Sequence, residues 1–125
     1  MENVALDTSV GIEIIKNNQN GVSVSEQISG NEIFLPSVGL FELLLRKTNL
    51  EAVEELANSV NLLAFDEKAA RKASDIAKEL SSKGEKIGSL NIFIAATAIV
   101  NDCALATLNT KDFSKIKGLK LVKLG

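Results

Sequence analysis

The side chains that could carry chemistry in this chain are carboxylates, amides, hydroxyls, lysines and arginines. The 125 residues include no histidine and a single cysteine. This composition excludes Ser-His-Asp and Cys-His nucleophilic sites, and it excludes zinc sites that need imidazole. The polar residues that stand out lie beside or within apolar segments, and they are Asp7, Glu42, Asn91, Asn109 and Asp112.

Two of these acids have a structural and a chemical interpretation. Asp7 follows a short apolar run and precedes Thr8 and Ser9. It could cap a helix, but either hydroxyl could do so instead and leave Asp7 free to bind a metal. Glu42 is the only acid in a strongly apolar helical stretch, with Arg46 four residues later. It could form a surface pair with Arg46, or it could be a half-buried carboxylate that needs a partner such as a metal.

The amides and the last acid are open to the same alternatives. Asn91 lies in the first turn of an apolar helical segment, with the small residues Ala95 and Ala98 on its side. Its amide could be a core polar group satisfied by the backbone, or it could face something that approaches closely. Asn109 and Asp112 occupy a polar loop, where turn-forming and capping residues are also expected.

Strand-like and helix-like segments alternate along the chain, which predicts one α/β domain spanning residues 1–125. We expect a mostly parallel sheet with helices on both faces. Ligands of such sheets bind beyond the carboxyl ends of the strands, where Asp7, Asn109 and Asp112 fall. The expected strands are 3–6, 33–35, 62–65, 104–107 and 120–124. The expected helices are 10–15, 21–29, 37–47, 50–59, 66–82 and 89–101, with a helical turn at 112–116. Ser37 and Asp66 are expected to cap the helices that they begin.

The overall charge limits how the protein could bind a nucleic acid. A net charge of −2 does not provide bulk attraction for phosphates, and the absence of Tyr and Trp disfavours base stacking. Contact with RNA or DNA would need a local basic patch, a bridging metal or a second subunit. The longest apolar runs are too short to span a bilayer, and the N-terminus lacks a basic signal region, so we expect a cytoplasmic protein.

Several segments together resemble a PIN domain, and more narrowly the VapC-type toxins of toxin–antitoxin pairs. They are Leu6-Asp7-Thr8-Ser9, Phe41-Glu42-Leu43, the helix that follows Phe65-Asp66, and the stretch 84–121. The most specific part is Ile87-Gly88-Ser89-Leu90-Asn91-Ile92-Phe93-Ile94, followed by Thr107-Leu108-Asn109-Thr110-Lys111-Asp112-Phe113. The resemblance implies a three-layer α/β/α sandwich and hydrolysis of RNA at an acidic site that holds Mg²⁺ or Mn²⁺.

The resemblance also implies roles for individual residues. Asp7 is the first acid of the site and Glu42 the second, and both are expected to be catalytic together with Asp112. Asn91 occupies the third position, where the family usually has Asp, and the fourth region falls on Asn109 and Asp112. Thr8, Thr107 and Arg46 are expected either to contact the substrate or to hydrogen-bond to the metal ligands and hold them in place.

Asn91 leaves the activity of this chain open, because an amide supplies one neutral oxygen and cannot act as a base. Three explanations of Asn91 are consistent with the sequence. It could be a natural change with which the enzyme still cleaves RNA, it could mark a natural pseudo-nuclease, or it could be a mutation introduced to suppress toxicity. We expect weak or no cleavage by the chain as written, with RNA as substrate and a small antitoxin and a second copy of the chain as partners. The alternative is an inactive PIN-fold binding module. The helices at 37–47 and 66–82 are the expected partner surfaces, unless the domain's own core buries them.

Overall fold

The computed structural model describes residues 2–125 and is organised around a five-stranded sheet in the order β3-β2-β1-β4-β5. Every neighbouring pair of strands is parallel, so the predicted mostly parallel sheet is confirmed. The strands are β1 (Asn3–Leu6), β2 (Glu32–Pro36), β3 (Asn61–Leu63), β4 (Ala104–Ala106) and β5 (Leu121–Val122).

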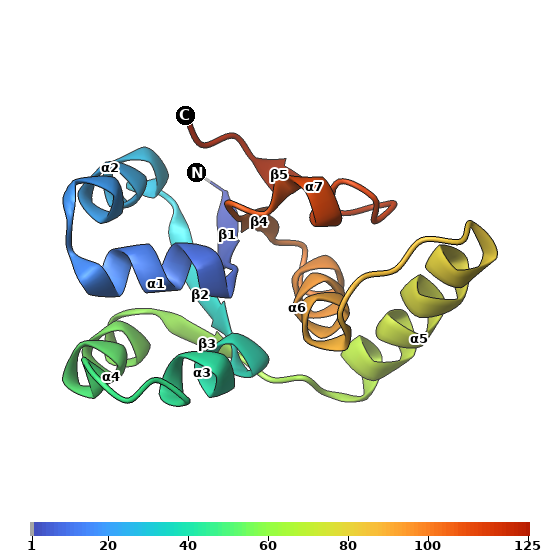
Figure 1. Ribbon diagram of the computed structural model, residues 1–125, viewed down its shortest axis with the longest axis horizontal. Coiled ribbons are helices and arrows are strands. Elements are labelled where there is room, and N and C mark those ends of the chain that lie inside the picture. The colour runs from blue at the N-terminus through green and yellow to red at the C-terminus, as the bar shows by residue number, and fades with distance from the viewer. Residues whose placement is uncertain (1) are drawn as a thin grey trace.

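Helices cover both faces of the sheet, with α1 to α4 on one side and α5 to α7 on the other (Figure 1). This is the three-layer α/β/α architecture that the sequence predicts. The helices are α1 (Thr8–Lys16), α2 (Gln19–Ile28), α3 (Ser37–Leu44), α4 (Leu50–Ser59), α5 (Glu67–Ser82), α6 (Ser89–Val100) and α7 (Thr110–Phe113).

The middle strand β1 supplies side chains to both layers. Val4, Ala5 and Leu6 have no exposed surface. Because successive side chains of a strand point to opposite faces, Val4 and Leu6 pack with α1 to α4, while Ala5 packs with α5 to α7. A stretch of strand buried on both faces must be apolar, which explains why no polar residue stands between exposed Asn3 and Asp7.

The helices α5 and α6 differ in sequence because α6 packs against the sheet, whereas α5 packs mainly against α6. Helix α5 packs against α6 and buries one stripe of side chains, while its other face is polar. The predicted cap is confirmed, since the Asp66 carboxylate accepts a hydrogen bond from the Ala69 amide at 3.0 Å. Helix α6 is apolar on nearly all sides and contributes to the main core. No helix within residues 2–125 combines the length and hydropathy needed to cross a membrane.

Three local predictions are corrected by the structure. Helix α3 ends at Leu44 instead of residue 47, because the Leu45 and Arg46 amides bond to carbonyls only three residues back. Ser37 does not cap this helix, and its hydroxyl instead accepts a hydrogen bond from the Phe65 amide at 3.2 Å. The helical turn predicted at 112–116 lies at Thr110–Phe113, where the Phe113 side chain is fully buried.

Helices α1 and α2 approach so closely that only glycine fits at position 21. A Cβ atom there would lie 2.0 Å from the backbone oxygen of Glu13. We expect Gly21→Ala to lower the free energy of unfolding by about 3 kcal/mol or more, because backbone must move. Urea denaturation measures this change. Gly39→Ala is the matched control within a helix, since its nearest contact would be an ordinary 3.5 Å from Leu35. Equal denaturation midpoints for the two variants would contradict the prediction.

The single cysteine should be unreactive in the folded protein. Burial raises the pKa of the Cys103 thiol, and the nearby charges of Asp102 and Glu32 raise this pKa further. The thiol should therefore react slowly with iodoacetamide at neutral pH and much faster in urea. In the unfolded chain the thiol ionises near its ordinary pKa of about 8.5, so the free energy of unfolding should fall as the pH rises above that value. In the Cys103→Ala variant, the decrease in the free energy of unfolding that comes from the thiol should be absent. An identical pH dependence of the free energy of unfolding in both proteins would contradict this prediction.

Candidate metal centre

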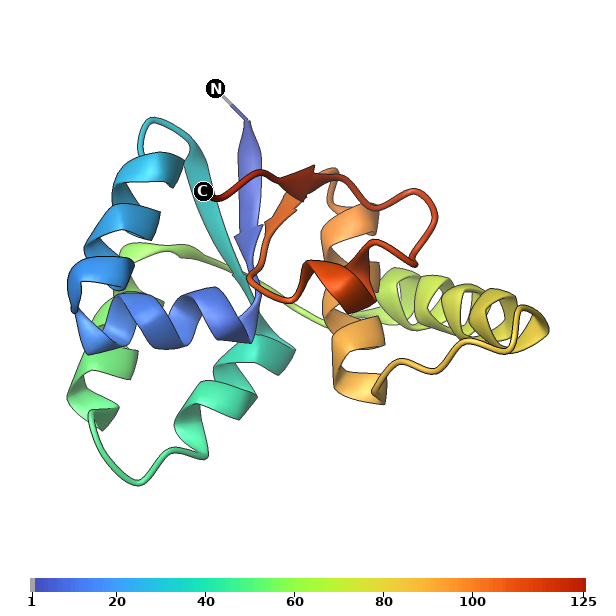
Figure 2. The ribbon, with the colours of Figure 1, turned by 45° about the horizontal axis from the view of Figure 1, so that its top comes forward.

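The candidate site begins where the two central strands end. Strands β1 and β4 pair in parallel with Leu6 opposite Ala106, so the next residues, Asp7 and Thr107, leave the sheet side by side. The pairing continues one step further, because the Asp7 amide donates to the Ala106 carbonyl at 3.0 Å. Figure 2 shows the starts of α1 and α3, and the short helix α7, at this same end of the sheet.

Asp7 is a buried carboxylate with its two oxygens in different situations. The side chain is 3% exposed, and Oδ2 accepts hydrogen bonds from the Ser9 hydroxyl at 2.8 Å and the Thr107 hydroxyl at 2.7 Å. Asp7 occupies the backbone capping position of α1 but makes no capping hydrogen bond, so the interpretation of Asp7 as a side-chain cap is wrong. Within residues 2–125, Oδ1 accepts no hydrogen bond and can take a ligand.

Backbone amides direct both hydroxyls toward Asp7. The Ser9 hydroxyl accepts from the Leu108 amide at 3.1 Å, and the Thr107 hydroxyl accepts from the Asn109 amide at 2.9 Å. A hydroxyl that accepts on one side has its proton available on the other, so each is fixed as a donor to the carboxylate. The sequence interpretation missed the role of Ser9. The available signal was the pair of hydroxyls directly after Asp7, of which Thr8 was expected near the site but Ser9 was interpreted only as a possible helix cap.

The late polar loop joins the same network. The Asn109 side-chain amide donates to the Asp112 carboxylate at 3.3 Å, and Asn109 is linked through its backbone amide to Thr107. A continuous chain of hydrogen bonds therefore runs from Asp7 through Thr107 and Asn109 to Asp112. These residues come from two parts of the sequence about a hundred positions apart, and the parallel pairing of β1 with β4 unites them.

Glu42 reaches the site through Thr8. The Thr8 hydroxyl donates to Glu42 Oε1 at 2.7 Å, while none of the salt bridges within residues 2–125 involves Arg46. The predicted alternative of a Glu42–Arg46 surface pair is therefore wrong. Arg46 lies beyond the end of α3, so regular helical spacing does not hold it beside Glu42. Its Nε atom is buried and has no hydrogen-bond partner among the described residues.

Like Arg46, Asn91 is a predicted site residue whose side chain takes no part in these hydrogen bonds within residues 2–125. It lies in the first turn of α6 and is half-buried, and its amide makes no hydrogen bond within residues 2–125. The backbone partner expected for a core amide is therefore not seen. Helix α6 packs against α3, the helix that carries Glu42.

The donor set at this edge of the sheet suits a hard cation that keeps some of its water. Within residues 2–125, no three carboxylate, thiol or imidazole side chains gather closely enough to hold a metal ion by themselves. Mg²⁺ is commonly held by one or two carboxylates together with water and substrate phosphates, and an all-protein cage is not required. The free oxygen of buried Asp7 is consistent with such a site.

The comparisons with known proteins agree with this geometry. The PIN-domain family model matches residues 4–119. The chain is 30% identical over 119 residues to Ribonuclease VapC19 of Mycobacterium tuberculosis, and the match covers 92% of this chain and 95% of that protein. It is 28% identical over 122 residues to the tRNA(fMet)-specific endonuclease VapC of Shigella flexneri, covering 92% of each chain.

Solved structures show the same fold. A chain of the DNA-bound VapBC from Salmonella typhimurium superposes with a TM-score of 0.87 at 26% identity, covering 100% of both chains. A chain of VapBC2 from Rickettsia felis, bound to a DNA fragment from the promoter, gives a TM-score of 0.83 at 23% identity over 96% of this chain and 97% of that one. The chain thus belongs to the PIN-domain family, within its branch of VapC-type toxins.

Proposed function

We propose that the protein is a cytoplasmic, metal-dependent ribonuclease that cleaves RNA at the Asp7 edge of the sheet. The observation that carries the proposal is the buried Asp7 carboxylate, with Oδ2 held by two hydroxyls and Oδ1 left for a ligand. The names of its relatives, ribonuclease and tRNA-specific endonuclease, support the same activity.

Each residue of the site has a defined task in this proposal. Asp7, Glu42 and Asp112 would hold Mg²⁺ or Mn²⁺ partly through bound water, because the three carboxylates do not gather closely enough to hold it alone, with side-chain oxygens of Asn91 and Asn109 as neutral ligands. A divalent cation held there lowers the pKa of water and offsets charge on the attacked phosphate.

The hydroxyl partners would keep the acids in position. Thr107 and Ser9 fix Asp7, and Thr8 fixes one oxygen of Glu42. The other oxygen of Glu42, or the Asp112 carboxylate, can orient the attacking water and accept its proton. Arg46 can contact a phosphate of the substrate, since no carboxylate within residues 2–125 forms a salt bridge with it.

The amide at position 91 should limit the activity of this chain. Asn91→Asp adds a negative charge and a second oxygen beside α3, so it should increase affinity for Mn²⁺ and accelerate cleavage of RNA by about tenfold or more. Calorimetry measures the metal affinity, and gel analysis of RNA incubated with Mn²⁺ measures cleavage. Asp7→Asn in the same background is the control and should remove both.

Two outcomes would separate the proposal from its alternative. Equal and vigorous cleavage by the unaltered chain and by the Asn91→Asp variant would show that an acid at this position is unnecessary. No binding of millimolar Mg²⁺ or Mn²⁺ by either protein would instead favour an inactive binding module that uses the PIN fold.

The hydroxyl of Thr107 should contribute to catalysis through Asp7. Thr107→Val keeps the shape of the side chain but removes the donor to Asp7 Oδ2, so cleavage by the Asn91→Asp protein should fall by about tenfold to a hundredfold. Thr107→Ser should restore most of it. Thr97→Val is the matched control, because Thr97 is equally buried but donates to the Phe93 carbonyl within α6. Equal losses in both valine variants would indicate a purely structural role.

We also propose that a small antitoxin covers the site. Large apolar side chains are exposed next to three of the site residues: Phe41 beside Glu42, Leu90 beside Asn91, and Leu108 beside Thr107, with exposed fractions of 50%, 37% and 51%. Apolar side chains around a polar centre are typical of a surface that a partner buries. Leu44, Leu45 and Leu50 extend this exposed apolar surface past the end of α3, where a second copy of the chain could pack instead. The mass of the purified protein in solution decides whether it forms a homodimer by itself.

A further inference from the structure

Positive charge is concentrated in the last part of the chain. Residues 110–125 contain five lysines and one acid, whereas residues 1–109 contain nine basic and fifteen acidic residues. The single acid is Asp112, which belongs to the candidate site. A chain with net charge −2 therefore has a strongly basic segment that starts at the site itself.

Three of the five lysines have no carboxylate partner. Lys115 forms a salt bridge with Glu85 at 3.1 Å, and Lys120 forms one with Glu2. Lys111, Lys117 and Lys123 are exposed and form no salt bridge within residues 2–125. Their charges are available to an anion.

A groove beside the candidate site is lined by one of these lysines, Lys123. It has a volume of about 620 Å³, and Thr107, the residue that donates to Asp7, is one of its lining residues. Its walls combine the polar residues Thr110 and Lys123 with apolar side chains that include exposed Leu108. Lys111 follows Thr110 directly in α7. A groove with cations and apolar surface suits a strand that has phosphates on one side and bases on the other.

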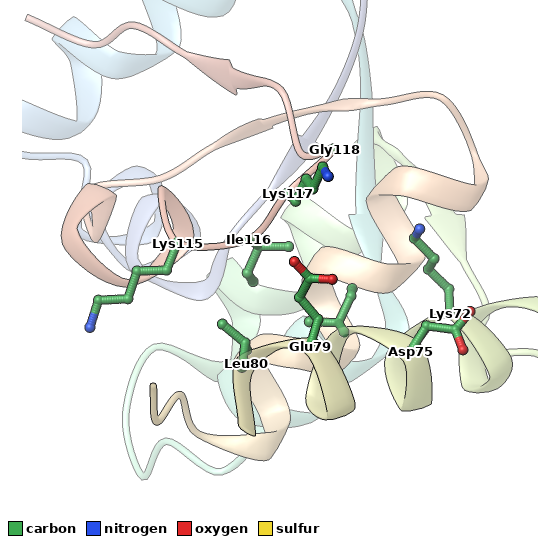
Figure 3. A pocket seen from close by; sticks show the side chains of 9 residues that line it. Lys72, Asp75, Glu79, Leu80, Lys115, Ile116, Lys117 and Gly118 are labelled. Carbon is green, nitrogen blue, oxygen red and sulfur yellow. The ribbon is translucent and has the colours of Figure 1, made fainter. Parts of the chain in front are cut away.

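A second hollow next to the same segment has a different charge. It lies between α5 and residues 115–118, with a volume of about 260 Å³. Lysines and acids both line it, and Figure 3 shows the Glu79 carboxylate pointing into the space between Lys72 and Lys115. The acids Asp75 and Glu79 would repel a phosphate chain, so the lysines of this hollow serve as an internal comparison.

We propose that the groove beside Thr107 carries the RNA strand away from the cleavage site, with Lys111 and Lys123 binding its phosphates. This rests on the proposed function, because it identifies the ligand as the RNA that is cleaved. The five lysines of residues 110–125 favour a polyanion over a protein segment, and Thr107 both lines the groove and donates to Asp7.

Binding of a short fluorescent RNA in the presence of EDTA tests the proposal without cleavage, because the proposed hydrolysis needs a divalent metal. The double variant Lys111→Gln/Lys123→Gln should bind about tenfold more weakly at low salt. Its plot of log affinity against log salt should be less steep by about 1.4, the value for two lost contacts to a single strand. Lys72→Gln/Lys117→Gln changes the net charge equally and should alter binding less than about twofold.

The outcomes distinguish this inference from the proposed function. Equal weakening by both double variants would overturn the groove as the path, because only general charge would matter. Weaker binding of a protein partner with unchanged RNA binding would overturn RNA as the occupant. The protein could bind RNA through Lys111 and Lys123 but fail to cleave it, even as the Asn91→Asp variant. That result would support the groove as the RNA path and refute the proposed ribonuclease activity.

Discussion

The requirement to satisfy one buried carboxylate determines how the two halves of this protein meet. Asp7 directly follows three fully buried strand residues, and a carboxylate charge in such a place is unfavourable by about several kcal/mol unless donors surround it. The donors are the hydroxyls of Ser9 and Thr107, each held by a backbone amide. This arrangement needs α1 to start at Thr8 and β4 to pair with β1 in one register. A shift of that register would remove the Thr107 donor and leave the carboxylate with Ser9 alone.

The layers of the fold could be predicted from local patterns. The apolar runs of the central strands and the stripe of buried residues along α5 depend on neighbours in sequence, and Asp66 caps α5 with an amide three residues away. Element ends were harder to predict. Helix α3 is followed by Leu45, Arg46 and Lys47, which are all good helix formers. The α-helix nevertheless ends at Leu44, and the next amides bond to carbonyls three residues back. Nothing in the local sequence marks that end.

The site was predictable in its residue types and less so in its contacts. Asp7 and Thr107 directly follow the ends of β1 and β4, and hydrogen bonds connect Thr107 to Asn109 and Asn109 to Asp112. Glu42 lies within α3 and is joined to Thr8, the residue after Asp7. Their partners were not predictable, because Thr107 donates to a carboxylate a hundred positions away and Glu42 accepts from a hydroxyl of another helix. Asn91 remains a prediction, since no hydrogen bond joins it to the others within the described residues.

The distance in sequence between Asp7 and Thr107 also bears on the order of events during synthesis. Strands β1 and β2 can pair early, but the donor that completes the carboxylate's surroundings arrives only with β4, after most of the chain has been made. A nascent chain that has not yet reached Thr107 cannot assemble this network. An unfinished chain therefore lacks the arrangement on which the proposed cleavage of RNA depends.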